Sequence, residues 1–238
     1  STLSSSSAAS DVYKRQTTFR EDVTPDWAPD NQRFVFPSQR SGDRRWQIFI
    51  AWADGKGESV SLVEGRTPTW SPDGTTIAYQ GTDTQGNNPG LYLVSAKGGP
   101  ATRLTDGESD RAPAWSPTCA VVSPTIIGTT TTATATATPS GNSTRGDCRI
   151  AFMSSQSGSW EIYVTDVVSG TVQRLTTSDG NAGLPTWSPN GSQIAFVSDQ
   201  GGNWGVYVMP ATGGEAVKVA DWGQEHADWL IERIAWVR

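Results

Sequence analysis

The chain has 238 residues, of which 25 are Gly and 14 are Pro, and it carries a formal net charge of −6. This density of chain-breaking residues excludes long helices. The acidic balance, 18 Lys and Arg against 24 Asp and Glu, has the wrong sign for binding nucleic acid or an anionic membrane surface. No apolar run reaches the length of a membrane-spanning helix, so we expect no direct membrane insertion.

The first residues differ in character from the rest of the chain. Residues 6–16 resemble the in-frame translation of a transposase adapter used in preparing sequencing libraries, so we expect residues 1–16 to lie outside the natural coding sequence. The alternative is a natural Ser- and Ala-rich disordered tail. Under the first interpretation the coding sequence begins partway along, and a signal peptide, an anchor or an upstream domain can be missing before it.

An internal repeat organises everything that follows. The motif Pro-x-Trp, or a close variant of it, recurs and places five tryptophans in register, at Trp27, Trp70, Trp115, Trp187 and Trp229. The intervals are 43, 45, 72 and 42 residues, so the third unit carries an insertion of about 29 residues. Complete units also repeat a Pro-Asp-Gly-like turn, a strand similar to Ile-Ala-Phe, a strand similar to Ile-Tyr-Val and a Gly turn.

Each repeat unit predicts a small antiparallel sheet. Four short runs of β-branched and aromatic residues, separated by Gly, Pro and Asp turns, are typical of successive hairpins. One four-stranded sheet cannot bury its own faces, and radial stacking of such sheets with a period near 43 residues is typical of a β-propeller. A sandwich would not repeat its sequence, and a parallel solenoid has shorter units. We therefore predict an all-β fold, a β-propeller of four-stranded antiparallel blades.

The repeated pieces Pro-x-Trp-Ser-Pro-Asp-Gly, Ile-Ala-Phe, Ile-Tyr-Val and Arg-Leu-Thr resemble the TolB-like propeller repeat. The resemblance covers residues 17–238 apart from the insertion, and it implies a ring that normally has six blades. Residues 17–238 provide about four full blades with partial strands at both ends. We expect an incomplete ring, an open arc whose unpaired edges favour self-association. The repeated tryptophans are interpreted as apolar wedges between blades rather than as binding residues.

The two cysteines stand at the ends of the insertion, which we place at about residues 119–148. Cys119 follows the third Pro-x-Trp segment, Cys148 precedes the next strand, and a polar Thr- and Ala-rich tract separates them. We predict a disulfide between Cys119 and Cys148, which implies an oxidising compartment. The alternatives are two free buried thiols or part of a metal site. A zinc site is disfavoured because the chain has one His and no Cys-x-x-Cys motif.

The sequence contains none of the usual catalytic arrangements. It has one histidine, and it lacks Gly-x-Ser-x-Gly, His-Glu-x-x-His, P-loop, dinucleotide-binding and EF-hand motifs. The segment Asp199–Trp204 is similar to the Asp box of sialidases, but it is one imperfect copy in a different loop. We therefore predict a chain that is not an enzyme and that binds no cofactor and no metal.

Antiparallel strands sort the loops onto two faces. The Ser-Pro-Asp-Gly turns, the Gly turns and the insertion share one face, which we call the turn face. The loop face holds the links into each Pro-x-Trp strand and the loops between the next two strands, and variable loops on a rigid scaffold are the usual place for binding. The predicted binding residues are Asp22, Asp26, Asp110, Arg111, Glu225, His226 and Asp228 near the centre, with Trp46, Trp160 and Trp204 further out. The alternatives are solvated loops with Trp residues that cover blade edges and, for Asp26 and Asp228, a channel mouth that holds a cation.

The resemblance implies a non-catalytic, exported scaffold that binds a protein or peptide through the loop face, in the periplasm or outside the cell. The alternative hypothesis is the gating or sensory propeller of a larger protein, such as a prolyl-oligopeptidase-like hydrolase or a membrane-anchored kinase. Sequence upstream of this chain would separate the two hypotheses.

Overall fold

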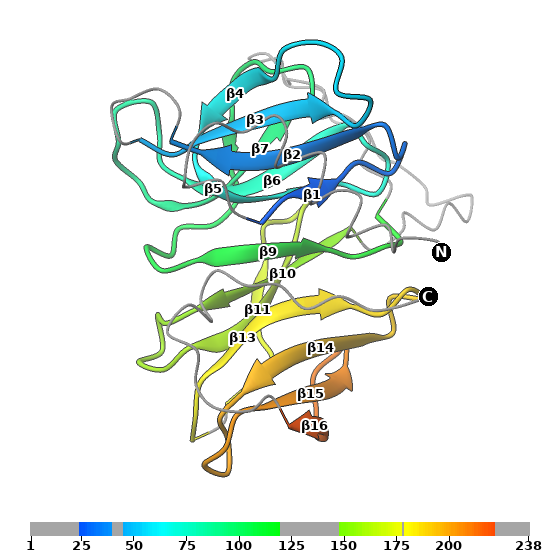
Figure 1. Ribbon diagram of the computed structural model, residues 1–238. Helices are drawn as coiled ribbons and strands as arrows, with labels where there is room; N and C mark the ends of the chain where they lie inside the picture. Colours follow the sequence, from blue (N-terminus) through cyan, green and yellow to red (C-terminus); the bar gives the residue numbers. More distant parts are fainter. Residues whose placement is uncertain (1–23, 40–44, 120–147, 178, 222–238) are drawn as a thin grey trace, which may run out of the picture.

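The structure is a computed structural model that describes residues 24–39, 45–119, 148–177 and 179–221. Within these ranges the chain forms sixteen strands and no helix, and so no helix long and apolar enough to cross a membrane. The strands make four antiparallel sheets of four strands each, and every sheet consists of four consecutive strands (Figure 1).

Each sheet corresponds to one unit of the sequence repeat, and we call the sheets the first to the fourth blade. The first blade contains β1 (Asp26–Trp27), β2 (Arg33–Ser38), β3 (Gln47–Trp52) and β4 (Val60–Glu64). The second contains β5 (Arg66–Trp70), β6 (Thr76–Gly81), β7 (Gly90–Ser95) and β8 (Thr102–Arg103). The third contains β9 (Arg111–Trp115), β10 (Arg149–Ser154), β11 (Glu161–Asp166) and β12 (Val172–Arg174). The fourth contains β13 (Ala182–Trp187), β14 (Gln193–Ser198), β15 (Gly205–Pro210) and β16 (Val217–Asp221).

The blades pack in chain order through their first strands. Strand β5 contacts both β1 and β9, and β9 in turn contacts β13. Figure 1 shows the sheets stacked from the first blade to the fourth, with the outer strands β4 and β16 far apart. This arrangement confirms the predicted all-β fold of four-stranded antiparallel blades, and the open set of sheets fits an incomplete propeller. The predicted domain boundaries and the predicted self-association stay predictions.

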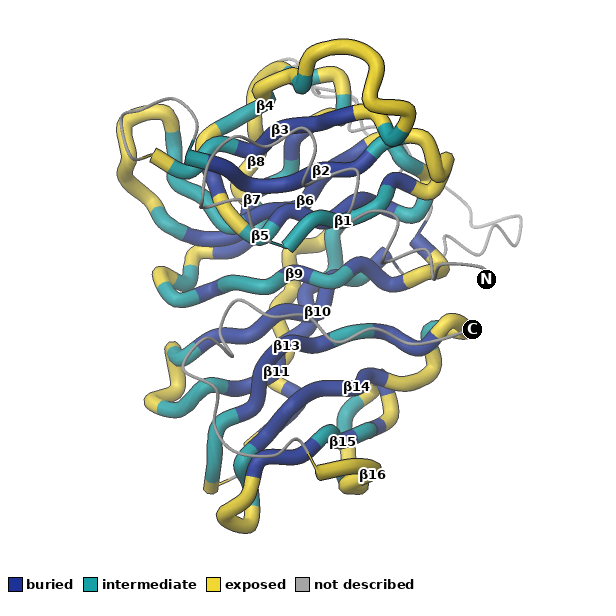
Figure 2. The backbone as a smooth tube through the Cα atoms, viewed as in Figure 1, coloured by how far each residue is buried: buried dark blue, intermediate teal, exposed yellow. Residues whose placement is uncertain are grey.

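The second strand of each blade lies in the core. In β6, Ile77, Ala78 and Tyr79 are all fully buried, and Figure 2 shows the same deep burial along β2, β10 and β14. A strand covered on both faces requires apolar residues at successive positions rather than at alternate ones. The continuous Ile-Ala-Phe runs therefore follow from blade stacking. The outermost strand β16, by contrast, is exposed along its whole length.

Three of the repeated tryptophans, Trp70, Trp115 and Trp187, lie between adjacent blades, as predicted. Trp115 of the third blade donates its indole N–H to the backbone oxygen of Thr69 in the second blade, at 3.2 Å. Trp187 of the fourth blade donates in the same way to the oxygen of Ala114 in the third, at 3.0 Å. Both rings are almost fully buried. Trp115 and Trp187 therefore each join neighbouring blades through apolar contact and one directional hydrogen bond.

The Ser-Pro-Asp-Gly turns are fixed by their own side chains. In the second blade the Asp73 carboxylate accepts hydrogen bonds from the Ser71 hydroxyl at 2.6 Å and from the backbone N–H of Thr75 at 3.0 Å. Gly74 has φ of 69°, a conformation that favours glycine. A side chain at this position would also lie 3.1 Å from the Pro29 ring of the first blade. The turn therefore sets both the hairpin and the contact with the preceding blade.

The first strand of each blade also carries an irregularity that the repeat does not reveal. The residue before the proline has φ between 45° and 53° at Thr24, Thr67, Ala112 and Leu184. The pairing register shifts at the same place in the second, third and fourth blades. Because a β-bulge bends its strand and increases the local twist, these bulges turn the loop-face end of each first strand away from regular pairing.

One buried ion pair strengthens the third blade. The Glu161 carboxylate is fully buried and accepts hydrogen bonds from the Arg174 guanidinium at 2.6 Å and from the Ser159 hydroxyl at 3.1 Å. The Thr176 hydroxyl also donates to it. The Arg174 side chain keeps 33% of its surface exposed, so water can partly solvate its charge if the carboxylate is removed.

We expect Glu161→Ala to lower the free energy of unfolding by about 2–3 kcal/mol, because it leaves a partly buried cation and a buried hydroxyl without their acceptor. Chemical denaturation of the variant and the wild type measures the effect. Glu108→Ala, at an exposed glutamate, is the matched control and should change stability by less than about 0.5 kcal/mol. Equal effects of the two substitutions would contradict this role of Glu161.

Candidate functional site

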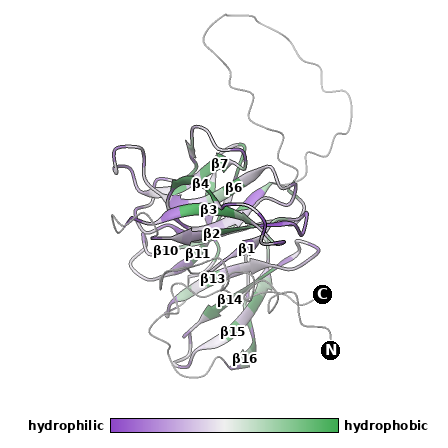
Figure 3. Ribbon diagram, turned by 45° about the horizontal axis from the view of Figure 1, so that its top comes forward, coloured by the Kyte–Doolittle hydropathy of each residue, from purple (hydrophilic) through white to green (hydrophobic). Residues whose placement is uncertain are grey.

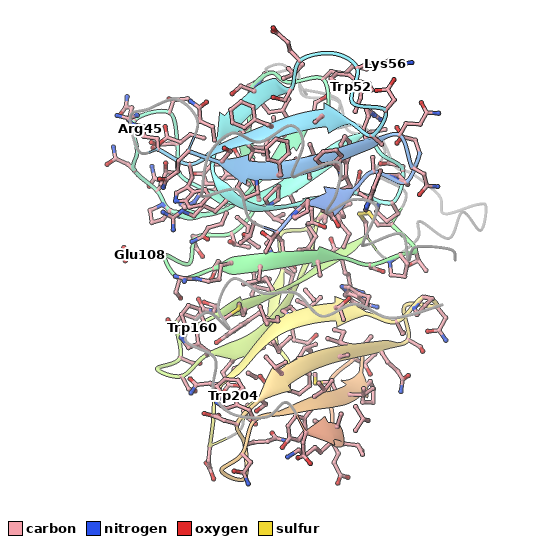
Figure 4. The ribbon with its side chains drawn as sticks, viewed as in Figure 1. Arg45, Trp52, Lys56, Glu108, Trp160 and Trp204 are labelled. Carbon is pink, nitrogen blue, oxygen red and sulfur yellow. A yellow bond between two sulfur atoms is a disulfide. The ribbon has the colours of Figure 1, made fainter. Side chains whose placement is uncertain are left out.

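The loop face is the side of the molecule on which the predicted binding residues gather. Figure 4 shows Arg45, Glu108, Trp160 and Trp204 along one side of the stacked blades, with Lys56 away from them. Lys56 belongs to the Gly turn after β3, on the turn face. In Figure 3 the strongest hydrophobic colour lies on strands, and the loops are mostly hydrophilic. The two faces predicted from strand alternation are therefore separate surfaces.

Arg111, the first residue of β9, is held by two contacts. Its guanidinium carbon lies 4.6 Å from the centre of the Trp160 ring, and its Nε donates to the backbone oxygen of Ser109 at 3.3 Å. The Ser109 hydroxyl is hydrogen-bonded to the Ser154 hydroxyl at 3.0 Å, which ties the β8–β9 link to the end of β10. Partial burial lowers the pKa of Arg111, and the positive charge of Arg66 lowers it further.

Arg66, the first residue of β5, occupies the equivalent position in the second blade. Its guanidinium carbon lies 5.0 Å from the centre of the Trp46 ring, which belongs to the first blade. The Trp46 backbone oxygen accepts a hydrogen bond from the N–H of Gly65 at 2.8 Å, so the ring is fixed next to the link between the two blades. Partial removal from solvent lowers the pKa of Arg66.

Neither Arg66 nor Arg111 has an ion-pair partner among the residues that the structure describes. The ion pairs found there join Arg33 to Asp30, Arg45 to Glu64, Arg174 to Glu161 and Lys218 to Asp221. Within the described ranges the loop face therefore presents two guanidiniums without an ion-pair partner, each beside a tryptophan ring, in a chain whose formal net charge is −6. This pair is the centre of the candidate site.

Asp110 lies next to Arg111 in sequence but does not neutralise it. The Asp110 side chain is buried and accepts a hydrogen bond from the backbone N–H of Gly107 at 3.2 Å. The Ser154 and Thr105 side chains also interact with the carboxyl and favour its charged form, but less than burial disfavours it. Burial raises the pKa of the Asp110 carboxyl, because the charged form loses its hydration.

The raised pKa makes the contribution of Asp110 to stability depend on pH. Between the ordinary Asp pKa of about 3.9 and the raised value, the folded chain binds more protons at this residue than the unfolded chain does. The stability contributed by Asp110 therefore rises as the pH falls through this window, and the ionised carboxylate lowers stability above it.

We expect Asp110→Asn to unfold at a higher temperature than the wild type at neutral pH, with a difference that shrinks as the pH approaches about 4. Thermal unfolding of both proteins across this range measures it. Subtracting the two curves removes the contributions of Asp30, Asp83 and Asp166, whose pKa values are lowered. A difference that does not vary with pH would contradict the assignment.

The structure places the other predicted residues as follows. The Asp26 carboxylate accepts hydrogen bonds from the Thr69 hydroxyl at 3.0 Å and the Trp70 backbone N–H at 2.7 Å, so it joins the first two blades. Trp204 is buried in the core shared by the third and fourth blades. The remaining predicted residues, Asp22, Glu225, His226 and Asp228, lie outside the described residues. No group of three or more His, Cys, Asp or Glu within the described ranges could hold a metal ion.

Sequence reasoning found Arg111, Trp160 and Trp46 but missed Arg66. The signal was present, because both arginines stand two residues before the proline of their unit, in Arg66-Thr-Pro-Thr-Trp and Arg111-Ala-Pro-Ala-Trp. The pairing of Arg66 with Trp46 joins two different repeat units, so it depends on how the blades stack. Sequence register alone cannot show that contact.

Four blades that stack through their first strands define the chain as part of a β-propeller. A family model for the TolB beta propeller domain matches residues 132–231. The chain is 28% identical over 166 residues to the protein TolB homolog of Chlorobium chlorochromatii, covering 67% of this chain and 29% of that protein. It is 36% identical over 103 residues to the uncharacterized peptidase YuxL of Bacillus subtilis, covering 39% of this chain and 15% of that protein.

A solved structure shows the same fold. The putative TolB from Agrobacterium tumefaciens has a TM-score of 0.64 to this chain at 20% identity, with 84% of this chain and 62% of that one covered. The chain is similar to TolB-like β-propellers, as the repeated motifs indicated. It spans less than a third of the length of either relative described above.

Proposed function

We propose that this chain is a non-catalytic scaffold that binds a protein or peptide partner through the loop face. The observation that carries the proposal is the pair formed by Arg66 and Arg111, which lie over tryptophan rings and have no acidic partner among the described residues. Tryptophan and arginine are, with tyrosine, the residues enriched at the energetic centres of protein interfaces. The rigid blades behind these loops reduce the entropy lost on binding.

We also infer that the protein is exported, to the periplasm or the extracellular space. The support is the resemblance to TolB together with the disulfide between Cys119 and Cys148, since disulfides persist in oxidising compartments. A signal peptide in the complete coding sequence would support this inference, and localisation of the full-length protein to the cytoplasm would contradict it.

The proposal is tested by locating a bound peptide on the protein. Peptides selected from a random display library against the chain are incubated with two versions of the protein, which carry a photo-crosslinking residue at Glu108 or at Lys56. Both positions are exposed, and they lie on different faces. We expect crosslinking from Glu108 and not from Lys56. Failure to select any peptide, or crosslinking from Lys56 alone, would overturn the proposal.

The second candidate function is the propeller of a larger protein, such as a hydrolase in which it controls access to a catalytic domain. The sequence similarity to the uncharacterized peptidase YuxL favours this candidate, because this chain matches only 15% of that protein. The complete gene distinguishes the two, because a hydrolase or kinase segment on the same chain would support the second. The proposal that this segment is itself non-catalytic is tested by incubating it with the selected peptides and searching for cleavage products by mass spectrometry.

A further inference from the structure

The guanidiniums of Arg66 and Arg111 each contact an aromatic ring with one of their faces. Each lies over an indole ring, at 5.0 Å from Trp46 and 4.6 Å from Trp160 respectively. A guanidinium placed over an aromatic face can still use the N–H groups along its edge as hydrogen-bond donors. Arg111 uses Nε for the Ser109 oxygen, which leaves its two terminal NH2 groups without a partner in the described part of the chain. The guanidinium of Arg66 has no hydrogen bond to a described residue.

The positions of these arginines bring their charges together. Arg66 begins β5 and Arg111 begins β9, and these two strands contact each other. Two like charges that are partly removed from water are unfavourable in the free protein, and a bound anion would relieve this repulsion. The neighbouring Asp110 does not relieve it, because its buried carboxyl turns to the Gly107 N–H instead.

Two other arginines lie over tryptophans in the same way but are compensated. Arg33 lies 5.0 Å from the Trp70 ring and forms an ion pair with Asp30 at 2.8 Å. Arg149 lies 5.0 Å from the Trp187 ring, and its positive charge interacts with the Asp166 carboxylate. Both begin the second strand of a blade, at its turn-face end, where they join adjacent blades. The uncompensated arrangement therefore belongs to the loop face.

We propose that Arg66 and Arg111 together form a binding site for a carboxylate of the peptide partner. The inference rests on the proposed function and adds the chemistry of the ligand. The carboxylate comes either from the free C-terminus of the partner or from an Asp or Glu side chain within it. The edges of the two guanidiniums donate hydrogen bonds to its oxygens, as in bidentate Arg–carboxylate pairs. The rings of Trp46 and Trp160 provide apolar surface for neighbouring side chains of the peptide.

A carboxylate fits this site better than a polyanion does. The net charge of −6 opposes the approach of nucleic acid or an anionic membrane. A single carboxylate, in contrast, requires only the local pair of cations, and its planar group matches the fork of an arginine.

The test measures retention of short synthetic peptide pools on the immobilised chain. One pool has a free C-terminus and no acidic residue, and a second is amidated with one central Glu. A third is amidated with no acidic residue, and a fourth is amidated with one phosphoserine. The variants are Arg66→Gln with Arg111→Gln and, as a control with the same change of charge, Lys56→Gln with Lys97→Gln on the turn face. Matching thermal unfolding temperatures verify that the variants are folded.

We expect the wild type to retain at least one carboxylate pool about tenfold more than the uncharged pool, since hydrogen bonds to charged groups are stronger than those between neutral groups. Which carboxylate pool is retained identifies its source. The advantage should disappear in the double Arg variant and persist in the double Lys control. Arg66→Lys with Arg111→Lys keeps the charge but loses the fork, so it should retain only part of the advantage. This variant also provides the test if the Gln variant does not fold.

Several results would overturn the inference. These are an equal advantage in the double Arg variant, an equal loss in both double variants, or preferred retention of the phosphoserine pool. Equal retention of all pools would overturn the inference while leaving peptide binding in place. Retention of no pool at all would overturn both the inference and the proposed function.

Discussion

Trp187→Ala should lower the free energy of unfolding by about 3–5 kcal/mol, in the range of large-to-small substitutions in cores. Trp187 is 6% exposed and lies in the cluster shared by the third and fourth blades, with Met153 and Ile162 on one side and Phe196 on the other. Its removal leaves a cavity between the blades and deprives the Ala114 oxygen of a hydrogen bond. Chemical denaturation measures the loss.

A pair of Phe substitutions isolates the hydrogen bond from the packing. Trp187 and Trp70 occupy equivalent positions, and each has an arginine 5.0 Å from its ring centre. The indole N–H of Trp187 has an acceptor, whereas that of Trp70 has none among the described residues. Trp187→Phe should therefore cost about 1 kcal/mol more than Trp70→Phe. An equal cost would show that the hydrogen bond contributes nothing to stability. A cost of Trp187→Ala near zero would show that the tryptophan is not the wedge between these blades.

Removal of the disulfide, by Cys119→Ala with Cys148→Ala, should lower the free energy of unfolding by about 3–4 kcal/mol. The structure joins these cysteines, which are 29 residues apart in sequence and both buried, so the predicted disulfide is confirmed. The effect arises mainly because the cross-link restricts the unfolded chain. Denaturation of the double variant is compared with that of the wild type under non-reducing conditions.

Reduction of the wild type provides the control for this prediction. A strong reductant should bring the wild type to the stability of the double alanine variant and leave the variant itself unchanged. Equal stability of oxidised wild type and variant would contradict a stabilising role. Mass spectrometry of a non-reducing digest should recover the Cys119–Cys148 linked peptide.

The repeat was sufficient to predict the blades because each piece of it has a local physical cause. Gly74 supplies the positive φ that its turn requires, and the runs around Ala78 and Ala195 supply strands buried on both faces. The tryptophans in register then indicate one wedge per blade. The turns, the strands and the tryptophans are each determined by neighbouring residues or by position within the repeat. Both kinds of information are present in the amino-acid sequence.

The bulges in the first strands could not be predicted in this way. Thr67, Ala112 and Leu184 adopt a positive φ, which residues with a Cβ avoid. Their conformation is imposed by the pairing of each first strand and by the packing of the blades around it, so nothing in their chemistry marks them. The bulges lie next to the loop-face end of the strands, one position after Arg66 and Arg111 in their blades.

The candidate site was predicted in composition but not in arrangement. From the sequence, acidic and aromatic residues were expected on the loop face, and Asp26 and Arg111 were both predicted as binding residues. In the structure Asp26 bonds to the second blade and Trp204 is buried in the core. The contact of Arg66 with Trp46 crosses between blades. Some polar side chains hold the blades together and others remain available for a partner. Only their contacts in the folded structure distinguish the two groups.

The central claim, that the loop face around Arg66 and Arg111 binds the partner, is tested most directly by hydrogen–deuterium exchange. Exchange is measured for the full chain alone and with the carboxylate peptide pool that it retains best. Binding at the proposed site should slow exchange of the backbone amides near residues 65–67 and 109–112, with the turn-face segments at 53–57 and 97–99 unchanged. Slower exchange confined to the turn-face segments, with none near the two arginines, would contradict the claim.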